Sequence, residues 1–135
     1  MSDVESSHDE RSLAREAVLA LLYEGASKDC DARELVELAV VPHDELVHVL
    51  VDGVEETRSS LDAIIGRFSQ GWSLERMPTI DLLILRLATY ELAHRPEVPV
   101  AVVIDEAVEL AKRFSTDDSG RFVNGVLASI ARDIR

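Results

Sequence analysis

The sequence predicts an all-α fold of about seven helices in two packed subdomains, a three-helix N-terminal layer and a C-terminal helical bundle. Apolar residues make up 47% of the chain and aromatic residues only 4%, so the core is expected to be aliphatic. Alanine and leucine are strong helix formers. Apolar residues recur at helical spacing, and no segment has the pattern of a strand. We expect one cooperative domain over residues 11–135, with subdomains of about 11–70 and 71–135.

The N-terminus is expected to combine a tail with a first helix. Residues 1–10 are polar and acidic and contain no lysine or arginine, which predicts a disordered tail. The first helix is predicted over about residues 11–24, with Gly25 ending it, because glycine commonly terminates helices. Its buried face is expected to comprise Ala14, Val18, Leu21 and Leu22.

Two further helices complete the N-terminal layer. A short helix is predicted over residues 32–39, with Asp31 as its N-cap. Pro42 then breaks the chain before a long helix over about residues 43–68. The buried stripe of the long helix is predicted from helical spacing at Leu46, Leu50, Val54, Leu61, Ile64, Ile65 and Phe68.

The C-terminal bundle is predicted to follow a junction at Gly71. A short helical turn is expected at residues 74–77, and a helix at 79–94. The helix ends before Pro96, because the residue preceding a proline disfavours helical backbone. The next helix is predicted over residues 100–114.

The last helix is predicted to start behind Thr116. This residue is a suitable N-cap, and Asp117 and Asp118 then fall in the first turn, where the helix dipole favours negative charge. The buried faces of the last two helices are predicted to comprise Val103, Ala107, Leu110, Ala111, Phe114, Phe122, Val126, Leu127 and Ile130.

The charge of the chain is strongly negative, at −12 with a pI near 4.6. Nonspecific affinity for nucleic acid comes mainly from lysine and arginine contacts to phosphates. The overall composition therefore argues against RNA binding and suits a basic protein partner better.

Cysteine usage and hydropathy indicate a cytoplasmic protein. The single cysteine, Cys30, excludes an internal disulfide and, without a signal peptide, indicates a reducing compartment. No apolar run reaches the roughly 18 residues needed to span a membrane. The closest stretch, residues 79–93, is interrupted by charged residues and is better explained as a buried helix.

The sequence offers no constellation for catalysis, for a metal or for a cofactor. Its histidines are scattered, and it contains no His-Glu-x-x-His motif, Cys-x-x-Cys motif or glycine-rich phosphate loop. The run Asp117-Asp118-Ser119 is better explained as the start of a helix than as part of a hydrolase site. We expect a protein that is not an enzyme and that uses no metal and no cofactor.

The start of the last helix has two interpretations that the residues leave open. Asp118, Ser119, Arg121 and Phe122 lie at a helix N-terminus, whose free N–H groups suit phosphate. Phe122 can stack on a base, although its spacing from Val126 fits a core position equally well.

The Asn124-Gly125 pair is unusual in a helix interior, where glycine costs about 1 kcal/mol relative to alanine. We favour a structural role, in which Gly125 lets a neighbouring helix approach closely and Asn124 ties a loop or a helix end. A ligand surface is the alternative.

Other polar residues also have two interpretations. Arg11 and Arg15 lie one turn apart and form either a solvated surface pair or part of a binding site. Glu75 and Asp81 lie around a helix start, where acidic residues are ordinary, or form a landing site for a basic partner. Tyr23 is expected to be half-buried, with its hydroxyl in water or on a partner.

Several segments resemble the NusB family of bacterial transcription factors. The resemblance is most specific between Asp81 and Ala128, in Leu-Arg-Leu-Ala-Thr-Tyr-Glu-Leu, Ile-Asp-Glu-Ala-Val-Glu-Leu-Ala-Lys and Phe-Val-Asn-Gly-Val-Leu. A looser match is Ala-Arg-Glu-Ala-Val-Leu-Ala-Leu-Leu-Tyr over residues 14–23.

The resemblance implies an adaptor that binds the ribosomal protein NusE and, with it, boxA RNA of ribosomal RNA operons. Such adaptors join the RNA polymerase antitermination complex and perform no chemistry. The resemblance also implies an RNA surface at Arg11, Arg15, Asp118, Ser119, Arg121 and Phe122, and a NusE surface at Glu75 and Asp81, with Tyr23 as a further partner contact.

The chain departs from the family at its N-terminus, where members typically carry several adjacent basic residues. Here only Arg11 and Arg15 remain, with Asp9 and Glu10 beside them. We therefore predict weak RNA affinity for the protein alone, with NusE supplying much of the positive charge. The alternative is a protein-only interaction module or a homodimer with weakened RNA binding, so both a monomer and a homodimer remain open.

Overall fold

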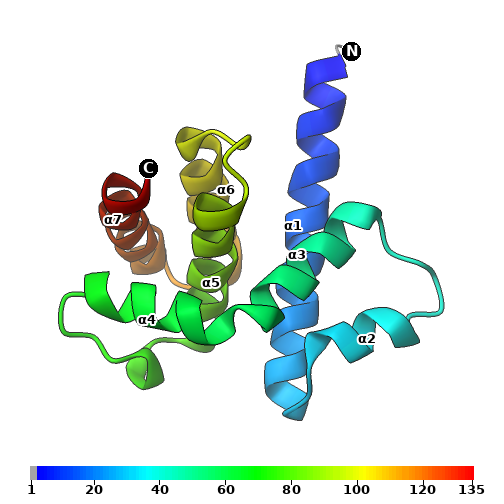
Figure 1. Ribbon diagram of the computed structural model, residues 1–135, viewed down its shortest axis with the longest axis horizontal. Helices are drawn as coiled ribbons and strands as arrows, with labels where there is room; N and C mark the ends of the chain where they lie inside the picture. The colour runs from blue at the N-terminus through cyan, green and yellow to red at the C-terminus, as the bar shows by residue number, and fades with distance from the viewer. Residues whose placement is uncertain (1–2) are drawn as a thin grey trace. The chain divides into compact units, whose positions relative to one another are not determined.

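The structure, a computed structural model, describes the backbone of residues 3–135 and the side chains from Glu10 onward. Over these residues it contains seven α-helices and one short 3-10 helix and no strand (Figure 1). The all-α prediction is thus confirmed. The chain forms two compact units that meet between Glu56 and Thr57, and not near Gly71 as the sequence predicted.

The first unit consists of α1 (Asp3–Lys28), α2 (Ala32–Leu38) and α3 (Glu45–Glu56). Both shorter helices pack on α1 and on each other, which gives the predicted three-helix layer (Figure 1). Its core is aliphatic, as predicted, and includes Ala14, Val18, Leu19, Leu22, Val36, Leu50, Val51 and Val54.

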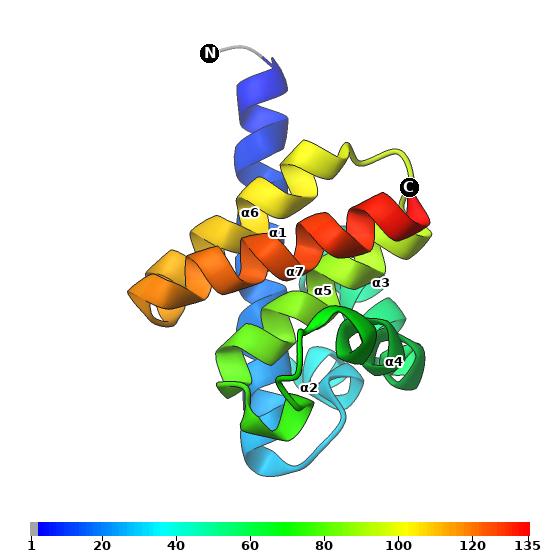
Figure 2. The same cartoon turned by 90° about the vertical axis from the view of Figure 1, so that its left-hand side faces the viewer.

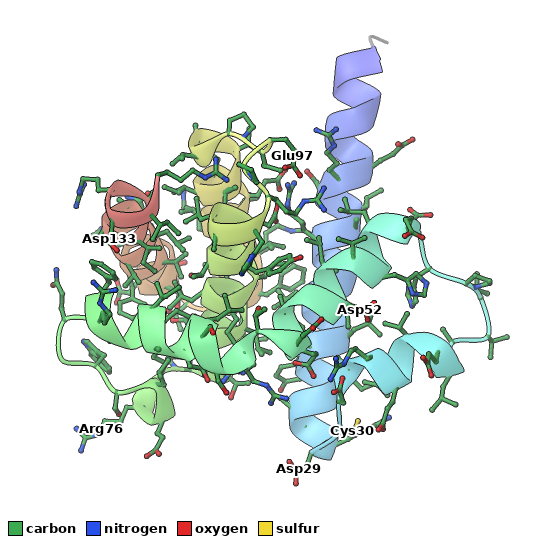
Figure 3. All side chains as sticks on the ribbon, viewed as in Figure 1. Asp29, Cys30, Asp52, Arg76, Glu97 and Asp133 are labelled. Atoms are coloured by element: carbon green, nitrogen blue, oxygen red, sulfur yellow. The ribbon has the colours of Figure 1, made fainter. Side chains whose placement is uncertain are left out.

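Both ends of α1 differ from the prediction. The helix begins at Asp3, so helical backbone covers most of the expected tail, and the remaining two positions lie outside the described residues. The helix also passes Gly25 and ends at Lys28, because Asp29 adopts the left-handed conformation there (φ 53°). Gly25 instead allows the chain to return closely, since a Cβ atom on it would lie 2.9 Å from the Cys30 carbonyl oxygen. Figure 3 labels Asp29 and Cys30 at this turn.

The start of α2 confirms the predicted N-cap. The Asp31 carboxylate accepts a hydrogen bond from the Arg33 backbone N–H at 2.8 Å and another from the Arg33 guanidinium at 2.7 Å. The side-chain bond from Arg33 holds the pKa of Asp31 below its ordinary value.

The long third helix predicted over residues 43–68 is two helices. α3 ends at Glu56 and α4 (Arg58–Phe68) begins after Thr57, whose backbone leaves the helical region (φ −105°, ψ 13°). Val54 and Leu61 are both fully buried, so the apolar spacing continues across the break. Periodicity therefore could not reveal it.

The second unit contains α4, the 3-10 helix η1 (Leu74–Arg76), α5 (Thr79–His94), α6 (Val100–Phe114) and α7 (Asp117–Ile134). α5 packs against α4, α6 and α7, and α6 and α7 lie side by side (Figure 2). The predicted bounds of α5 and α6 are confirmed. The core of this unit includes Leu61, Ile65, Ile84, Leu85, Val103, Leu110, Val123, Leu127 and Ile130.

Two packing predictions in this unit are wrong. Phe114 is 43% exposed because it lies at the end of α6, where its ring packs under the Arg113 guanidinium. The close helix approach occurs at Gly120, where a Cβ atom would lie 3.2 Å from Lys112 Cγ of α6. At Gly125 a Cβ atom would meet nothing within 4 Å.

Arg135, directly after α7, fastens the end of this helix to the end of α5. The Arg135 guanidinium donates hydrogen bonds to the carbonyl oxygens of Leu92 at 3.0 Å and Val98 at 2.6 Å, and to those of Glu91 and Arg95. Carbonyls in the last turn of a helix lack partners further along the helix, so the guanidinium supplies a donor at the end of α5.

Candidate nucleic-acid interface

The start of α7 is fixed by a hydrogen-bond network. Thr116 Oγ1 accepts from the Ser119 backbone N–H at 3.2 Å, and Ser119 Oγ accepts from the Thr116 N–H at 3.3 Å, which is a reciprocal capping box. Asp81, in the first turn of α5, accepts hydrogen bonds from the hydroxyls of Ser119 at 2.9 Å and Ser115 at 2.6 Å. The network thus joins the start of α5 to the connection between α6 and α7.

Asp81 and Ser119 are structural residues of this network. Each is only 3% exposed, and their polar atoms are used inside the protein. The contact of Asp81 with a protein partner and the contact of Ser119 with RNA stay predictions. The sequence places both residues at helix starts, but it does not show that their side chains face each other.

Two hollows open beside this network. The first, of about 280 Å³, has an apolar lining from Trp72, Met77, Pro78 and Phe122 and a polar lining from Asp81, Thr116, Asp118 and Ser119. The second is lined by Phe68, Ser69, Gln70, Trp72, Arg121, Phe122, Gly125 and Val126. Trp72 and Phe122 therefore border both hollows.

The two aromatic rings form an edge-to-face pair. The ring centroids of Trp72 and Phe122 lie 6.3 Å apart, with an angle of 62° between the ring planes. Phe122 is half-buried and Trp72 is 56% exposed. The ring thus packs against protein and also lines both hollows, and its stacking on a base stays a prediction.

The predicted charged residues at the start of α7 lie at the surface. Asp118 and Arg121 are exposed, and each lines one of the two hollows. Together with Phe122 they form a site that can contact phosphate, a base edge and a base face.

The formal charge of −12 is divided unevenly between the two units. Residues 1–56 contain 4 Lys and Arg against 15 Asp and Glu, a net charge of −11. Residues 57–135 contain 10 Lys and Arg against 11 Asp and Glu, a net charge of −1. The excess of negative charge that disfavours a polyanion therefore belongs to the first unit, and both hollows belong to the second.

The two N-terminal arginines differ in exposure. Arg11 is exposed on α1, as a phosphate contact requires. Arg15 is only 3% exposed, because it shares the helix face of the buried residues Val18, Leu19 and Leu22. The structure therefore does not bring the two arginines together at one surface, and Arg15 is not displayed for a phosphate.

The remaining predicted partner contacts are exposed. Tyr23 is 46% exposed on α1, which agrees with the expected half-buried ring, and Glu75 is exposed on η1. They belong to different units.

Sequence reasoning missed Trp72 as a site residue. The sequence placed it at a junction after Gly71 and gave it no role. It is the only tryptophan of the chain, and it follows a glycine in a segment without helical periodicity. A large aromatic residue in such a segment is the signal that could have identified it.

Over the part of the chain that the structure describes, neither a metal-binding cluster nor a membrane-spanning helix is present. Among those residues, no three His, Cys, Asp or Glu side chains gather closely enough to hold a metal ion. None of the described helices combines the length and apolar character needed to cross a membrane.

Comparisons with known proteins agree on one family. The model of the NusB family matches residues 8–132. The transcription antitermination protein NusB of Saccharopolyspora erythraea is 46% identical over 127 residues, which cover 90% of this chain and 86% of that one.

Solved structures support the same relationship. NusB of T. maritima superposes with a TM-score of 0.83 at 37% sequence identity, covering 91% of each chain. A structure of the antitermination factors NusB and NusE in complex with dsRNA superposes with a TM-score of 0.78 at 25% identity, covering 93% of this chain and 98% of that one.

Proposed function

The chain belongs to the NusB family, and from this membership we propose that it is a transcription antitermination adaptor. In this proposal it binds the ribosomal protein NusE and, with it, boxA RNA of ribosomal RNA operons, and it joins the RNA polymerase antitermination complex. The observation that carries the proposal is the match to the family over residues 8–132. The similarity to a NusB that was solved with NusE and dsRNA supports it.

The proposed RNA surface lies at the start of α7. Arg121 contacts phosphate, Asp118 accepts from base edges, and Phe122 offers an aromatic face. Arg11 on α1 is a further phosphate contact. Arg15 and Ser119 are not included in this proposed surface, because their side chains are buried.

The proposed protein partner is basic. A unit with a net charge of −11 attracts a basic ribosomal protein and speeds their encounter. Tyr23 and Glu75 are the predicted partner contacts that are exposed. Asp81 holds the start of α7 instead.

The proposed role is one of recognition alone. The adaptor is not an enzyme, uses no cofactor and acts in the cytoplasm, where transcription and the ribosomal proteins are found. Its two hollows present aromatic rings and helix-capping side chains, and the hydroxyls beside the Asp81 carboxylate belong to the hydrogen-bond network that caps α7.

A protein-only module or a homodimer is the second candidate. The burial of Arg15 favours it, because it removes one of only two arginines in the family's N-terminal basic segment. In this candidate the partner surface works without RNA.

Affinity capture from cell extract, with and without ribonuclease, tests the adaptor against this candidate. The adaptor predicts that NusE is retained under both conditions and that RNA polymerase is lost after ribonuclease treatment. Retention of every partner after ribonuclease favours the protein-only module. Failure to retain NusE under either condition contradicts the proposed function.

A further inference from the structure

We infer that Trp72 is a base-stacking residue, and that an unstacked base of single-stranded RNA packs on its exposed indole face beside Phe122. This inference rests on the proposed RNA-binding function. It adds Trp72 as a contact residue and single-stranded RNA as the ligand class. A stacking site of this kind takes a base from a single strand and not one from a duplex.

Trp72 is held in place by a tight, hydrogen-bonded turn. Its backbone N–H donates to the Ser69 carbonyl oxygen at 3.1 Å, and its own carbonyl oxygen accepts from Ser69 Oγ at 2.7 Å. Ser69 is 2% exposed, so both bonds anchor the turn in the second unit. The indole is therefore displayed from a fixed backbone.

The same turn places two residues at positive φ, and one of them, Gln70, is not a glycine. Gln70 (φ 52°) and Gly71 (φ 87°) both lie in the left-handed region. A side chain at positive φ is unfavourable, and such residues persist where the surrounding structure requires them, often at binding sites. Here they precede a tryptophan that is 56% exposed, whereas tryptophan is usually well buried.

The aromatic geometry suits one flat ligand ring. Phe122 meets Trp72 edge to face, so it fixes the indole orientation and leaves an indole face open. Bases of a duplex already stack on their neighbours, whereas an unpaired base gains by stacking on a protein aromatic ring.

The surroundings of the pair match the other parts of a nucleotide. Arg121 is exposed and lines the second hollow, so its guanidinium can contact a phosphate. Asp118 lines the first hollow and can accept a hydrogen bond from the amino group of a base. An apolar side chain of a protein partner would leave the guanidinium charge and the Asp118 hydrogen-bond acceptor unused.

The test compares RNA binding by four full-length proteins in the presence of NusE. These are the unchanged protein, Trp72→Leu, Trp72→Phe and the control Phe114→Leu. Phe114 is also an exposed aromatic residue of the second unit, but it lines neither hollow. The probes are a labelled single-stranded boxA RNA and a duplex of the same sequence, and NusE binding is measured separately. Circular dichroism establishes that each variant is folded.

We expect Trp72→Leu to weaken single-strand binding by about tenfold or more. Trp72→Phe retains most of the affinity, because it keeps an aromatic face, and Phe114→Leu matches the unchanged protein. NusE affinity stays the same in all four. Because Trp72 is the only tryptophan, single-stranded RNA added to the protein at low salt also quenches its fluorescence.

Three outcomes overturn the inference. If Trp72→Leu binds the single strand as the unchanged protein does, Trp72 does not stack, although the adaptor function stands. If Trp72→Leu instead loses affinity for NusE, the indole contacts a protein and not a base. If the unchanged protein binds no RNA with NusE present, the proposed function fails and the inference fails with it.

Discussion

Asp81 has two interpretations in the sequence, and the structure shows which contacts its side chain makes. Its position at a helix start fits either a helix charge or a docking site for a basic partner. In the structure its two carboxylate oxygens accept from the hydroxyls of Ser115 and Ser119, and the side chain is 3% exposed. The residue therefore positions the start of α7 and also lines the first hollow beside it.

Replacing Asp81 tests this role. Asp81→Ala leaves two hydroxyls without their acceptor, so we expect the free energy of unfolding to fall by about 1–3 kcal/mol. Urea denaturation measures the change. Glu75→Ala is the matched control, because Glu75 is an exposed acidic residue of η1, and its effect should stay within about 0.5 kcal/mol. Unchanged stability in Asp81→Ala, together with lost NusE binding, would show that Asp81 is a partner contact.

Arg121 is the residue whose phosphate role can be measured most directly. Loss of one phosphate contact lowers the slope of log affinity against log salt by about 0.7 for single-stranded nucleic acid. We expect Arg121→Ala to show this change when RNA binding is measured with NusE. Arg132→Ala removes an exposed arginine from the same helix, outside both hollows, and should leave the slope unchanged. If Arg121→Ala and Arg132→Ala have equal slopes of log affinity against log salt, Arg121 does not contact an RNA phosphate.

Within the single element α7, the two glycines have different surroundings. Gly120 is buried against α6, with Lys112 and Val108 close by. Gly125 is exposed and borders the second hollow, and its Cβ position is empty. Packing therefore explains the first glycine and not the second. Gly125 lies at the candidate interface, which favours its ligand-surface interpretation.

Alanine substitutions test this difference. Gly125→Ala should raise the free energy of unfolding by about 0.5–1 kcal/mol, because alanine is the better helix former and its methyl group meets no atom. Gly120→Ala should gain less, since its Cβ atom would press on Lys112. Thermal or urea unfolding of both variants measures the two effects. An equal or larger gain at Gly120 would contradict the packing assignment.

The helices themselves were largely predictable, for local reasons. Pro96, the Thr116 cap and the Asp31 cap each act within one turn of the helix end they define. The break at Thr57 was not predictable, because it interrupts no apolar spacing and involves neither glycine nor proline. Nor did the sequence show that Asp29 would take the left-handed position after α1 in place of Gly25.

The candidate site was predictable only in part. Residues that act through their position at a helix start, such as Asp118 and Arg121, are exposed as expected. The buried network and Trp72 depend on segments far apart in the chain, since Ser119 meets Asp81 and Phe122 meets Trp72. A linear pattern carries no information about such pairs.

At the scale of the whole molecule, the division of charge reconciles an acidic protein with RNA recognition. The first unit carries a net charge of −11 and the second a net charge of −1. The second unit can thus present Arg121 and the aromatic pair to RNA without a large repulsive field of its own. It also lacks the dense positive charge that gives strong affinity by itself. We therefore expect tight binding to require a basic partner.

A titration of labelled boxA RNA, followed by native gel electrophoresis, tests this central claim most directly. The protein is added alone, with NusE, and with NusE at raised salt, and NusE alone is the control. We predict weak binding by the protein alone and tight, salt-sensitive binding by the pair that exceeds the binding by NusE. Tight, salt-sensitive binding by the free protein, or no gain over NusE when the two are combined, would contradict the account.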